Sequence, residues 1–545
     1  MTQSADAIYV NGEIVTVDQD NPAAQALAVR GGRITAVGDR DEVVAAQQGP
    51  NTRVVDLDGA ALLPGFIDPH SHYINSLTVA NQVNVFAPPA GPGADVPAII
   101  AALNAFREAH PVPPGEMLVA YGYDDTLMPA GRTLHKEDLD ADFPDTPVLV
   151  GHVSMHGAVL NSAAMRKFGI TAETETPPGG VIVRKEGSNE PDGLVMETAF
   201  LPIFAAMPKP TAAQEIEWSK AGQMLYAAAG ITTAHEGASH ASDIALMQRA
   251  AAGGATLIDV VAYPFILDLD QILADNPPDT FGSYVNGLKL GGVKVTLDGS
   301  PQGRTAYFTT PYLVEGPDGQ KNWCGELPFT QDTVNGWFKR VYDLGVPLDI
   351  HANGDAAIDV ALTAHEFAAA EDPAKPRHTV MVHSQFVRQD QLDRYLAYNI
   401  IPSFFTQHTY YFGDAHVRLR GQAQADFLSP MRAAIDLGLL PTNHTDFVVT
   451  PLDQLFVMWT AVNRVSRSGA VIGADQRVTP QEALQAITIN AARQYGEADR
   501  KGSLEVGKIA DLVVLDRNPL TVDPMAIKDV TVVETIKDGA TIYRS

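Results

Sequence analysis

The sequence contains a histidine pair, His70 and His72, separated by one residue. The pair follows shortly after a mostly apolar run at residues 62–67. Side chains alternate between the two faces of a strand, so in an extended segment both imidazoles point the same way, with Cα atoms roughly 6–7 Å apart. Two neutral imidazoles on one face can bind a divalent cation, at Zn–N distances of about 2.0–2.1 Å. A polar strand end is the simpler explanation of such a pair, so other residues must decide.

Four more residues with metal-binding or acid–base side chains follow apolar segments: Lys294, His351, His383 and Asp446. Taken singly, His383 would be a core histidine and His351 the cap of a helix. Lys294 would pair with Asp298, and Asp446 would be a helix N-cap. The occurrence of all four at or near strand ends, in barrel order, favours one shared site over four coincidences.

The elements that must position these residues alternate between short apolar segments and helical patterns, which is typical of βαβ units and a parallel sheet. The segments span residues 62–72, 230–235, 258–263, 292–298, 346–351, 379–383, 400–405 and 440–446. Eight such units predict an α/β fold with a (β/α)8 TIM-like barrel. In such barrels the active site lies at the carboxyl ends of the strands, where all the candidate residues occur.

Strand patterns with tight turns also occur at both ends of the chain, which indicates one discontinuous, small β-sandwich domain. The long gap between the first two barrel strands predicts an inserted subdomain over the barrel mouth, where insertions usually shape substrate choice. The expected parts are a composite domain of residues 1–62 plus 497–545, a barrel of residues 63–496, and an inserted subdomain of residues 80–215.

The 545-residue chain is strongly acidic, with a formal net charge of −27 from 65 acidic and 38 basic residues. Such a charge disfavours nucleic acid and anionic membranes as partners, and no apolar run reaches the ~18 residues of a membrane span. The single cysteine, Cys324, excludes an intrachain disulfide and a zinc site built from several cysteines. The first residues lack the pattern of a secretory signal, so we expect a cytoplasmic enzyme.

The candidate residues lie in motifs that resemble amidohydrolase family 3, a branch of the amidohydrolase superfamily of metal-dependent hydrolases that includes N-substituted formamide deformylases. The motifs are PGFIDPHSH at 64–72, VKV at 293–295, DGS at 298–300, RTA at 304–306, HANGD at 351–355, HSQ at 383–385, Asp446, and GSLEVGKIADL at 502–512. The first and last are typical of the superfamily, and residues 298–306 narrow the resemblance to this branch. It extends from about residue 7 to the C-terminus.

This resemblance implies a metal site of six ligands: His70 and His72 for the more buried ion, His351 and His383 for the more exposed ion, Lys294 as a bridge, and Asp446. Lys294 would be carboxylated by CO2, which requires a free amine and hence a lowered pKa. Asp446 would take the proton of a water whose pKa the metal lowers from about 15.7 to about 7, and would protonate the leaving nitrogen. The implied cofactor is one or two zinc ions, with one ion if Lys294 is unmodified.

Six further residues are candidates for substrate binding: Tyr123, His156, His235, Arg304, His408 and His444. Each histidine of this set has a simpler alternative role as a packed or hydrogen-bonded residue. Members of the family often have Gly-Ser-Asp before the strand-eight aspartate, where this chain has His444-Thr445-Asp446. They usually have Gly-Trp-Asp where it has Gly122-Tyr123-Asp124, so we expect the pocket to differ at both places.

The sequence therefore predicts a metal-dependent amidohydrolase that cleaves a non-peptide C–N bond in an amide-like small molecule. Aromatic residues near the strand ends, among them Tyr307 and Phe405, favour an N-alkyl or N-aryl amide such as an N-substituted formamide. A mononuclear zinc deaminase of a cyclic amidine is the alternative enzyme, and a non-catalytic relative would be expected to lose ligands that this chain keeps. The ligand types also suit manganese, iron or cobalt, and a homodimer is the expected oligomer.

Overall fold

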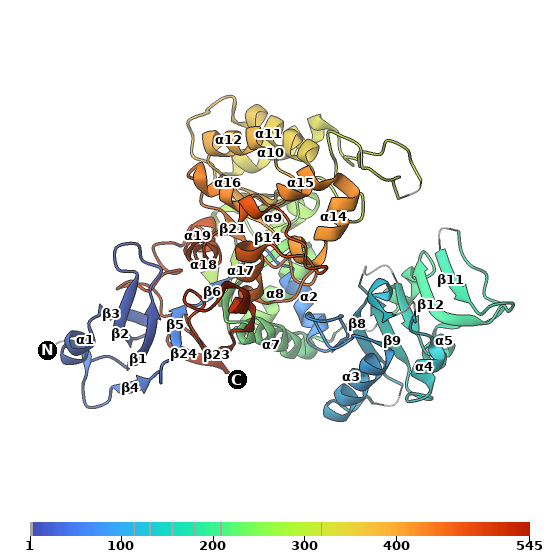
Figure 1. Cartoon of the computed structure of the whole chain (residues 1–545), viewed down its shortest axis with the longest axis horizontal. Helices are drawn as coiled ribbons and strands as arrows, with labels where there is room; N and C mark the ends of the chain where they lie inside the picture. Colours follow the sequence, from blue (N-terminus) through green and yellow to red (C-terminus); the bar gives the residue numbers. More distant parts are fainter. Residues whose placement is uncertain are drawn as a thin grey trace. The chain divides into compact units, whose positions relative to one another are not determined.

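The computed structural model of the chain describes residues 4–113, 115–129, 132–153, 157–178, 180–207, 210–317 and 319–545 (Figure 1). The chain divides into two compact units. The barrel unit comprises Met1–Ser76 and Gly222–Ser545, and the inserted unit comprises Leu77–Ala221. All six predicted metal ligands lie in the barrel unit.

Eight strands among the described residues of the barrel unit correspond to the eight segments predicted from the sequence. They are β6 (Phe66–Ile67), β13 (Ile231–Ser239), β14 (Asp259–Pro264), β17 (Val293–Thr296), β18 (Leu348–Ala352), β19 (Thr379–His383), β20 (Ile400–Phe404) and β21 (Thr442–Asn443). Parallel pairing links β6 to β13 and β13 to β14, and it links the strands from β17 to β21 in chain order. Each strand therefore lies beside its neighbour in the sequence, as in a barrel.

The two groups of strands are joined at β14 and again between the last and first strands. A parallel bridge pairs Phe265, directly after β14, with Lys294 in β17. Asp446 N–H donates to the carbonyl oxygen of His70 at 3.0 Å, and His72 N–H donates to the carbonyl oxygen of Phe447 at 2.7 Å. The fold is thus the α/β fold with a (β/α)8 barrel that the sequence predicted.

The run at residues 62–72 is not one strand, contrary to the sequence expectation. Its first part, β5 (Ala61–Pro64), pairs with β22 (Leu512–Leu515) in a different sheet, whereas β6 pairs with β13. The chain crosses between the sheets at Gly65, where an added Cβ would lie 2.5 Å from the Thr232 side chain. The predicted strand is broken because the chain passes from one sheet to the other here. The histidine pair therefore lies in the segment after β6.

Strands from both ends of the chain form one sheet, in the order β24-β23-β22-β5-β1-β2-β3, with β4 paired to β1 (Figure 1, blue and dark red). The remaining bounds are β1 (Ala7–Val15), β2 (Ala23–Arg30), β3 (Arg33–Gly38), β4 (Arg53–Asp56), β23 (Val532–Lys537) and β24 (Ala540–Arg544), with α1 (Arg40–Gln47). Alternate residues of β1 enter two apolar clusters: Tyr9 packs with Leu512, and Ile8 packs with Val43 of α1. This alternation is the expected consequence of the strand's period of two.

Helices and two short strands complete the barrel unit, and two of these helices, α2 and α7, extend along the sequence into the residue range of the inserted unit. They are α2 (Tyr73–Val79), α7 (Ala212–Ala228), α8 (Ala241–Ala252), α9 (Leu269–Asp275), β15 (Tyr284–Val285), β16 (Leu288–Leu290), α10 (Gln331–Leu344), α11 (Asp355–Ala369), α12 (Gln389–Tyr398), α13 (His408–Tyr411), α14 (Gly413–Arg420), α15 (Gln422–Asp426), α16 (Met431–Asp436), α17 (Gln454–Asn463), α18 (Pro480–Ala486) and α19 (Ile489–Gln494). Short 3-10 helices occur at Asp125–Leu127, Ile266–Asp268, Pro278–Thr280, Ala474–Gln476 and Pro524–Asp529. Local chemistry sets several ends: the Thr330 side chain caps α10, which ends at Gly345 in the left-handed region. In the described part of the chain, no helix has both the length and the apolar composition needed to span a membrane.

The inserted unit is built on a six-stranded sheet in the order β11-β12-β10-β9-β8-β7. Its elements are β7 (Val83–Asn84), α3 (Val96–Ala109), β8 (Leu118–Tyr123), α4 (Lys136–Asp140), β9 (Val148–His152), β10 (Gly157–Leu160), α5 (Ser162–Phe168), β11 (Gly180–Arg184), β12 (Pro191–Glu197) and α6 (Leu201–Ala205). Neighbouring residues of β9 enter two apolar clusters, with Val150 in one and Leu149 in the other. The unit therefore has a core of its own.

Candidate metal centre

Three side chains converge where the first and last barrel strands meet. The Nε2 atoms of His70 and His72 each lie 3.3 Å from Oδ1 of Asp446. The Nδ1 atom of His72 lies 3.0 Å from the carbonyl oxygen of Gly237, which can only accept, so in the neutral ring Nδ1 carries the proton and Nε2 is unprotonated. Two imidazole nitrogens and a carboxylate oxygen thus face one point.

A second pair of imidazoles lies beside this group. Nδ1 of His351 lies 3.0 Å from Nε2 of His383, and the two ring centroids are 4.5 Å apart. Two nitrogens on one tetrahedral zinc ion lie roughly 3.3–3.4 Å apart, close to the separation of this pair. Ligand atoms of His70, His383 and Asp446 lie within 4.8 Å of one another, so the two groups form one cluster.

Gly237 in β13 allows the His70 ring to reach the cluster. A Cβ atom at this position would lie 2.6 Å from Cε1 of His70 and 3.0 Å from Cε1 of His235. Any larger residue would therefore displace one of the two rings. The residue also fixes His72, through the carbonyl contact described above.

Lys294 lies in the barrel interior near His70, His351 and His383, whose pKa values are lowered by burial and also by the charge of Lys294. It is buried in β17, in register with Asp349 of β18, and its Nζ atom has no hydrogen-bond partner among the described residues. Burial lowers the pKa of Lys294 to about 8, against the opposing charges of Asp349, Asp446 and Glu236. At this pKa about a tenth of the amine is unprotonated at pH 7, which is the form that reacts with CO2.

The donor set of this cluster fits a divalent cation. Oδ1 of Asp446 and Nζ of Lys294 are buried without a hydrogen-bond partner in the described residues. Buried polar atoms are costly when they have no partner, so two such atoms in one cluster call for a ligand. Imidazole nitrogens and carboxylate oxygens are ordinary ligands of zinc and of related transition metals.

Buried carboxylates around the cluster were missed by the sequence reasoning. Asp349 lies two residues before His351 on the same strand face, and its Oδ2 lies 3.2 Å from Nε2 of His235. Glu236 accepts a hydrogen bond from Ile74 N–H at 2.6 Å, and burial raises its pKa to about 8. The period of two could have indicated Asp349, whereas no local signal marks Glu236.

Asp298 ties the loop after β17 to the end of β18. Its carboxylate accepts hydrogen bonds of 2.9 Å from the backbone N–H groups of Asn353, Gly354 and Tyr307. Its Oδ1 also lies 3.6 Å from Nε2 of His351. Burial raises the pKa of Asp298 to about 7, although the three N–H groups oppose that rise. The motif that carries Asp298 thus positions the segment beside a predicted ligand.

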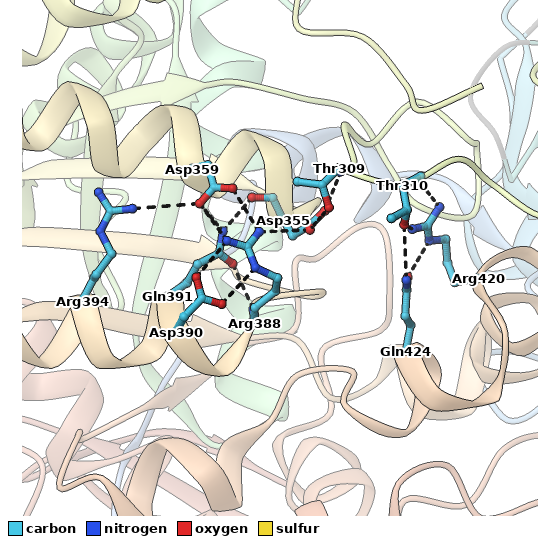
Figure 2. Close-up of polar contacts among 10 residues, drawn as sticks. All are labelled: Thr309, Thr310, Asp355, Asp359, Arg388, Asp390, Gln391, Arg394, Arg420 and Gln424. Atoms are coloured by element: carbon cyan, nitrogen blue, oxygen red, sulfur yellow. Dashed lines mark hydrogen bonds and ion pairs between the residues drawn. The ribbon is translucent and has the colours of Figure 1, made fainter. Parts of the chain in front are cut away.

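The same loop is held further out by two charged groups, which Figure 2 shows. Thr309 donates its backbone N–H at 2.9 Å and its hydroxyl to the carboxylate of Asp355, which also accepts from Arg388 at 3.0 Å. Thr310 accepts two hydrogen bonds from Arg420, of 3.0 Å at its carbonyl and 2.8 Å at its hydroxyl. Two consecutive threonines therefore bind the loop to α11 on one side and to α14 on the other.

The residues predicted to bind substrate occupy varied positions. His235 and His444 are fully buried in the barrel, and His408 pairs with His416 at 3.1 Å between Nδ1 and Nε2. Arg304 donates to the carbonyl oxygen of Glu315 at 2.8 Å. Tyr123 lies in the core of the inserted unit, where its hydroxyl accepts from Leu134 N–H, and His156 lies outside the described residues. A part in substrate binding stays a prediction for all six.

Comparison with known proteins decides the family. The sequence profile of the amidohydrolase family matches residues 53–543. The chain belongs to this family. An N-substituted formamide deformylase from Arthrobacter pascens is 30% identical to this amidohydrolase over 100% of the chain and 99% of its own length. The protein LONG AFTER FAR-RED 3 of Arabidopsis thaliana is 27% identical over 94% of the chain and 88% of its own length.

The fold of the amidohydrolase is also found among solved structures. An uncharacterized metal-dependent hydrolase from Pyrococcus horikoshii OT3 superposes with a TM-score of 0.72 at 22% identity, over 95% of this chain and 99% of that one. The profile match and the full-length deformylase relative confirm the family predicted from the sequence motifs, and the amidohydrolase is an enzyme.

Proposed function

We propose that this amidohydrolase cleaves the C–N bond of an amide-like small molecule with the help of a divalent cation, and that N-substituted formamides are its substrates. The observation that carries the proposal is the convergence of the Nε2 atoms of His70 and His72 on Oδ1 of Asp446. The similarity to a formamide deformylase along the full length of the chain supports the choice of substrate.

The chain's own residues hold the cation and move the proton. When bound, the cation supplies Lewis acidity and lowers the pKa of water. Asp446, with one oxygen directed at the imidazoles, has a second oxygen to accept a proton from the attacking water. It then delivers this proton to the leaving nitrogen, so that formamide and water yield formate and an amine.

Lys294 is proposed to carry a carbamate, and zinc is the proposed metal. The Nζ atom is buried without a partner among the described residues, and its lowered pKa supplies free amine. Bond formation between Nζ and CO2, with loss of one proton, would give a carbamate whose two oxygens could serve as metal ligands. With this group the cluster has ligands for two ions, and without it for one.

The aromatic surroundings favour an apolar substituent on the nitrogen of the substrate. The Phe405 ring lies 6.0 Å from the His383 ring and 4.4 Å from the His408 ring, measured between centroids. An aromatic ring packed beside the cluster suits an N-alkyl or N-aryl group better than a charged one.

The test is product analysis with purified protein of known metal content. N-aryl formamides, polar cyclic amides and a cyclic amidine would be supplied in parallel, and formate, amine and ammonia would be measured. We expect formate and amine from the N-aryl formamides, loss of this activity on chelation, and recovery with zinc. Release of ammonia from the amidine alone would instead identify a deaminase, and activity that survives complete metal removal would refute the proposal.

A further inference from the structure

We propose that His444 is a positioning residue that holds the predicted ligand His383 in the tautomer and orientation needed to bind a cation. Nε2 of His444 lies 3.1 Å from Nδ1 of His383, and Nδ1 of His444 lies 3.0 Å from Oγ of Ser403. These three residues lie on or directly after three adjacent strands, β19, β20 and β21. The inference rests on the proposed metal site and is independent of the substrate.

Only one placement of the ring protons of His383 and His444 allows His383 to bind a metal ion. His383 must present an unprotonated Nε2 on the side of His351, so the single proton of its neutral ring lies on Nδ1. That proton is donated to Nε2 of His444, whose own proton therefore lies on Nδ1 and is donated to Ser403. The opposite direction of donation would place a proton on Nε2 of His383 and exclude the cation. Partners of this kind fix the tautomer and orientation of metal-bound histidines.

The surroundings of His444 suit a residue that acts through its neighbours. The side chain is fully buried, both ring nitrogens have partners, and the ring packs at 5.0 Å against Phe405. The His444 backbone N–H is also fixed, by a 3.0 Å hydrogen bond to the carbonyl oxygen of Phe404. His444 therefore acts through His383, which differs from the substrate contact expected from the sequence.

The test compares the zinc affinity of metal-free wild type with that of His444→Phe, His444→Gln and Ser403→Ala, by competition with a chromophoric chelator. His444→Phe removes the acceptor, and we expect it to weaken binding of at least one zinc ion by about 10–100-fold. His444→Gln can accept from Nδ1 of His383 through its amide oxygen, so it should retain most of the affinity. Ser403→Ala should weaken binding in the same direction by a smaller factor, because one hydrogen bond remains.

The matched control is His365→Phe, which removes another buried histidine, on α11 and outside the metal cluster. It should bind zinc as wild type does. Equal affinity in His444→Phe and wild type would overturn the inference while leaving the metal site in place, whereas failure of wild type to bind zinc would overturn the proposed function itself. Circular dichroism would show whether His444→Phe folds. If it does not, wild-type affinity in Ser403→Ala together with loss of binding in His444→Gln would refute the proposed role of His444.

Discussion

The backbone N–H of Asp446 donates a hydrogen bond of 3.0 Å to the carbonyl oxygen of His70. Together with the hydrogen bond from His72 N–H to the carbonyl oxygen of Phe447, this bond joins the last barrel strand to the first. The Asp446 carboxylate lies 3.3 Å from the imidazole of His70. Asp446 and His383 both have positive φ angles, of 52° and 71°, in a region that non-glycine residues seldom adopt. Such strain persists where surrounding contacts fix the backbone, as at functional sites, so the two residues are placed at an energetic cost.

Replacement of Asp446 by Asn should nearly abolish turnover. The amide cannot accept the proton of water, and general acid–base groups contribute about 10²–10⁴-fold to rate, so we expect kcat to fall by that factor. Steady-state formate release, corrected for bound metal, provides the measurement. Asp275→Asn, at an exposed position on α9, is the matched control. A variant of Asp446 that retains more than a tenth of wild-type kcat would contradict the assigned role.

Replacement of Lys294 by Met should reduce the number of bound metal ions from two to one. The thioether fills similar space but cannot form a carbamate, so the bridge between two ions would be lost. Elemental analysis of both proteins gives the stoichiometry, and 13C-labelled bicarbonate should give a carbamate resonance in wild type alone. One ion in both proteins, with no labelled resonance, would show that Lys294 stays unmodified.

The barrel could be predicted because each strand is a short apolar segment followed by its helix, and local patterns carry that information. Residues 379–383 were predicted as a strand and form β19 with those bounds. The first strand was predicted less well, because its break at Gly65 depends on Thr232 and Asp511, which approach from distant parts of the chain. The pattern of apolar and polar residues within 62–72 does not indicate those contacts.

The candidate ligands could be named from the sequence because they follow strands whose order fixes their place. The residues that contact these ligands could not be named from the sequence. The contact of His444 with His383 depends on the register of three strands, and Glu236 contacts the segment after β6 through Ile74. Such pairings are decided by tertiary packing, and residue type alone does not distinguish a partner in the barrel interior from a residue that contacts substrate.

The loop after β17 gives a stability prediction that separates two similar aspartates (Figure 2). Asp355 accepts from both Thr309 and Arg388, whereas Asp359 contacts Arg388 and makes no hydrogen bond to the loop among the described residues. Asp355→Asn should therefore loosen residues 298–317 and lower stability by about 1–3 kcal/mol, the cost of weakening charged hydrogen bonds. Thermal unfolding and limited proteolysis would show this, with Asp359→Asn as the control. Equal protease sensitivity in the two variants would argue against this role of Asp355 in holding the loop.

His365 on α11 provides a pH-dependent contribution to stability. The side chain is buried, its Nδ1 lies 2.7 Å from the Tyr342 hydroxyl, and its ring stacks on Tyr398 at 4.8 Å. Burial, with a smaller contribution from Arg377, lowers the pKa of His365 to about 4. The folded protein therefore holds this imidazole neutral at a pH where the unfolded chain binds a proton.

The sign of the effect follows from these two pKa values. Between the ordinary value of about 6.5 and the folded value of about 4, the unfolded state binds more protons, so stability falls as the pH falls through that interval. At pH 5 the loss amounts to about 2 kcal/mol, and above pH 7 it vanishes. His365→Phe lacks the titrating group, so between pH 7.5 and pH 5 it should lose about 2 kcal/mol less unfolding free energy than wild type. Parallel loss in the two proteins would mean that His365 titrates normally in the folded state.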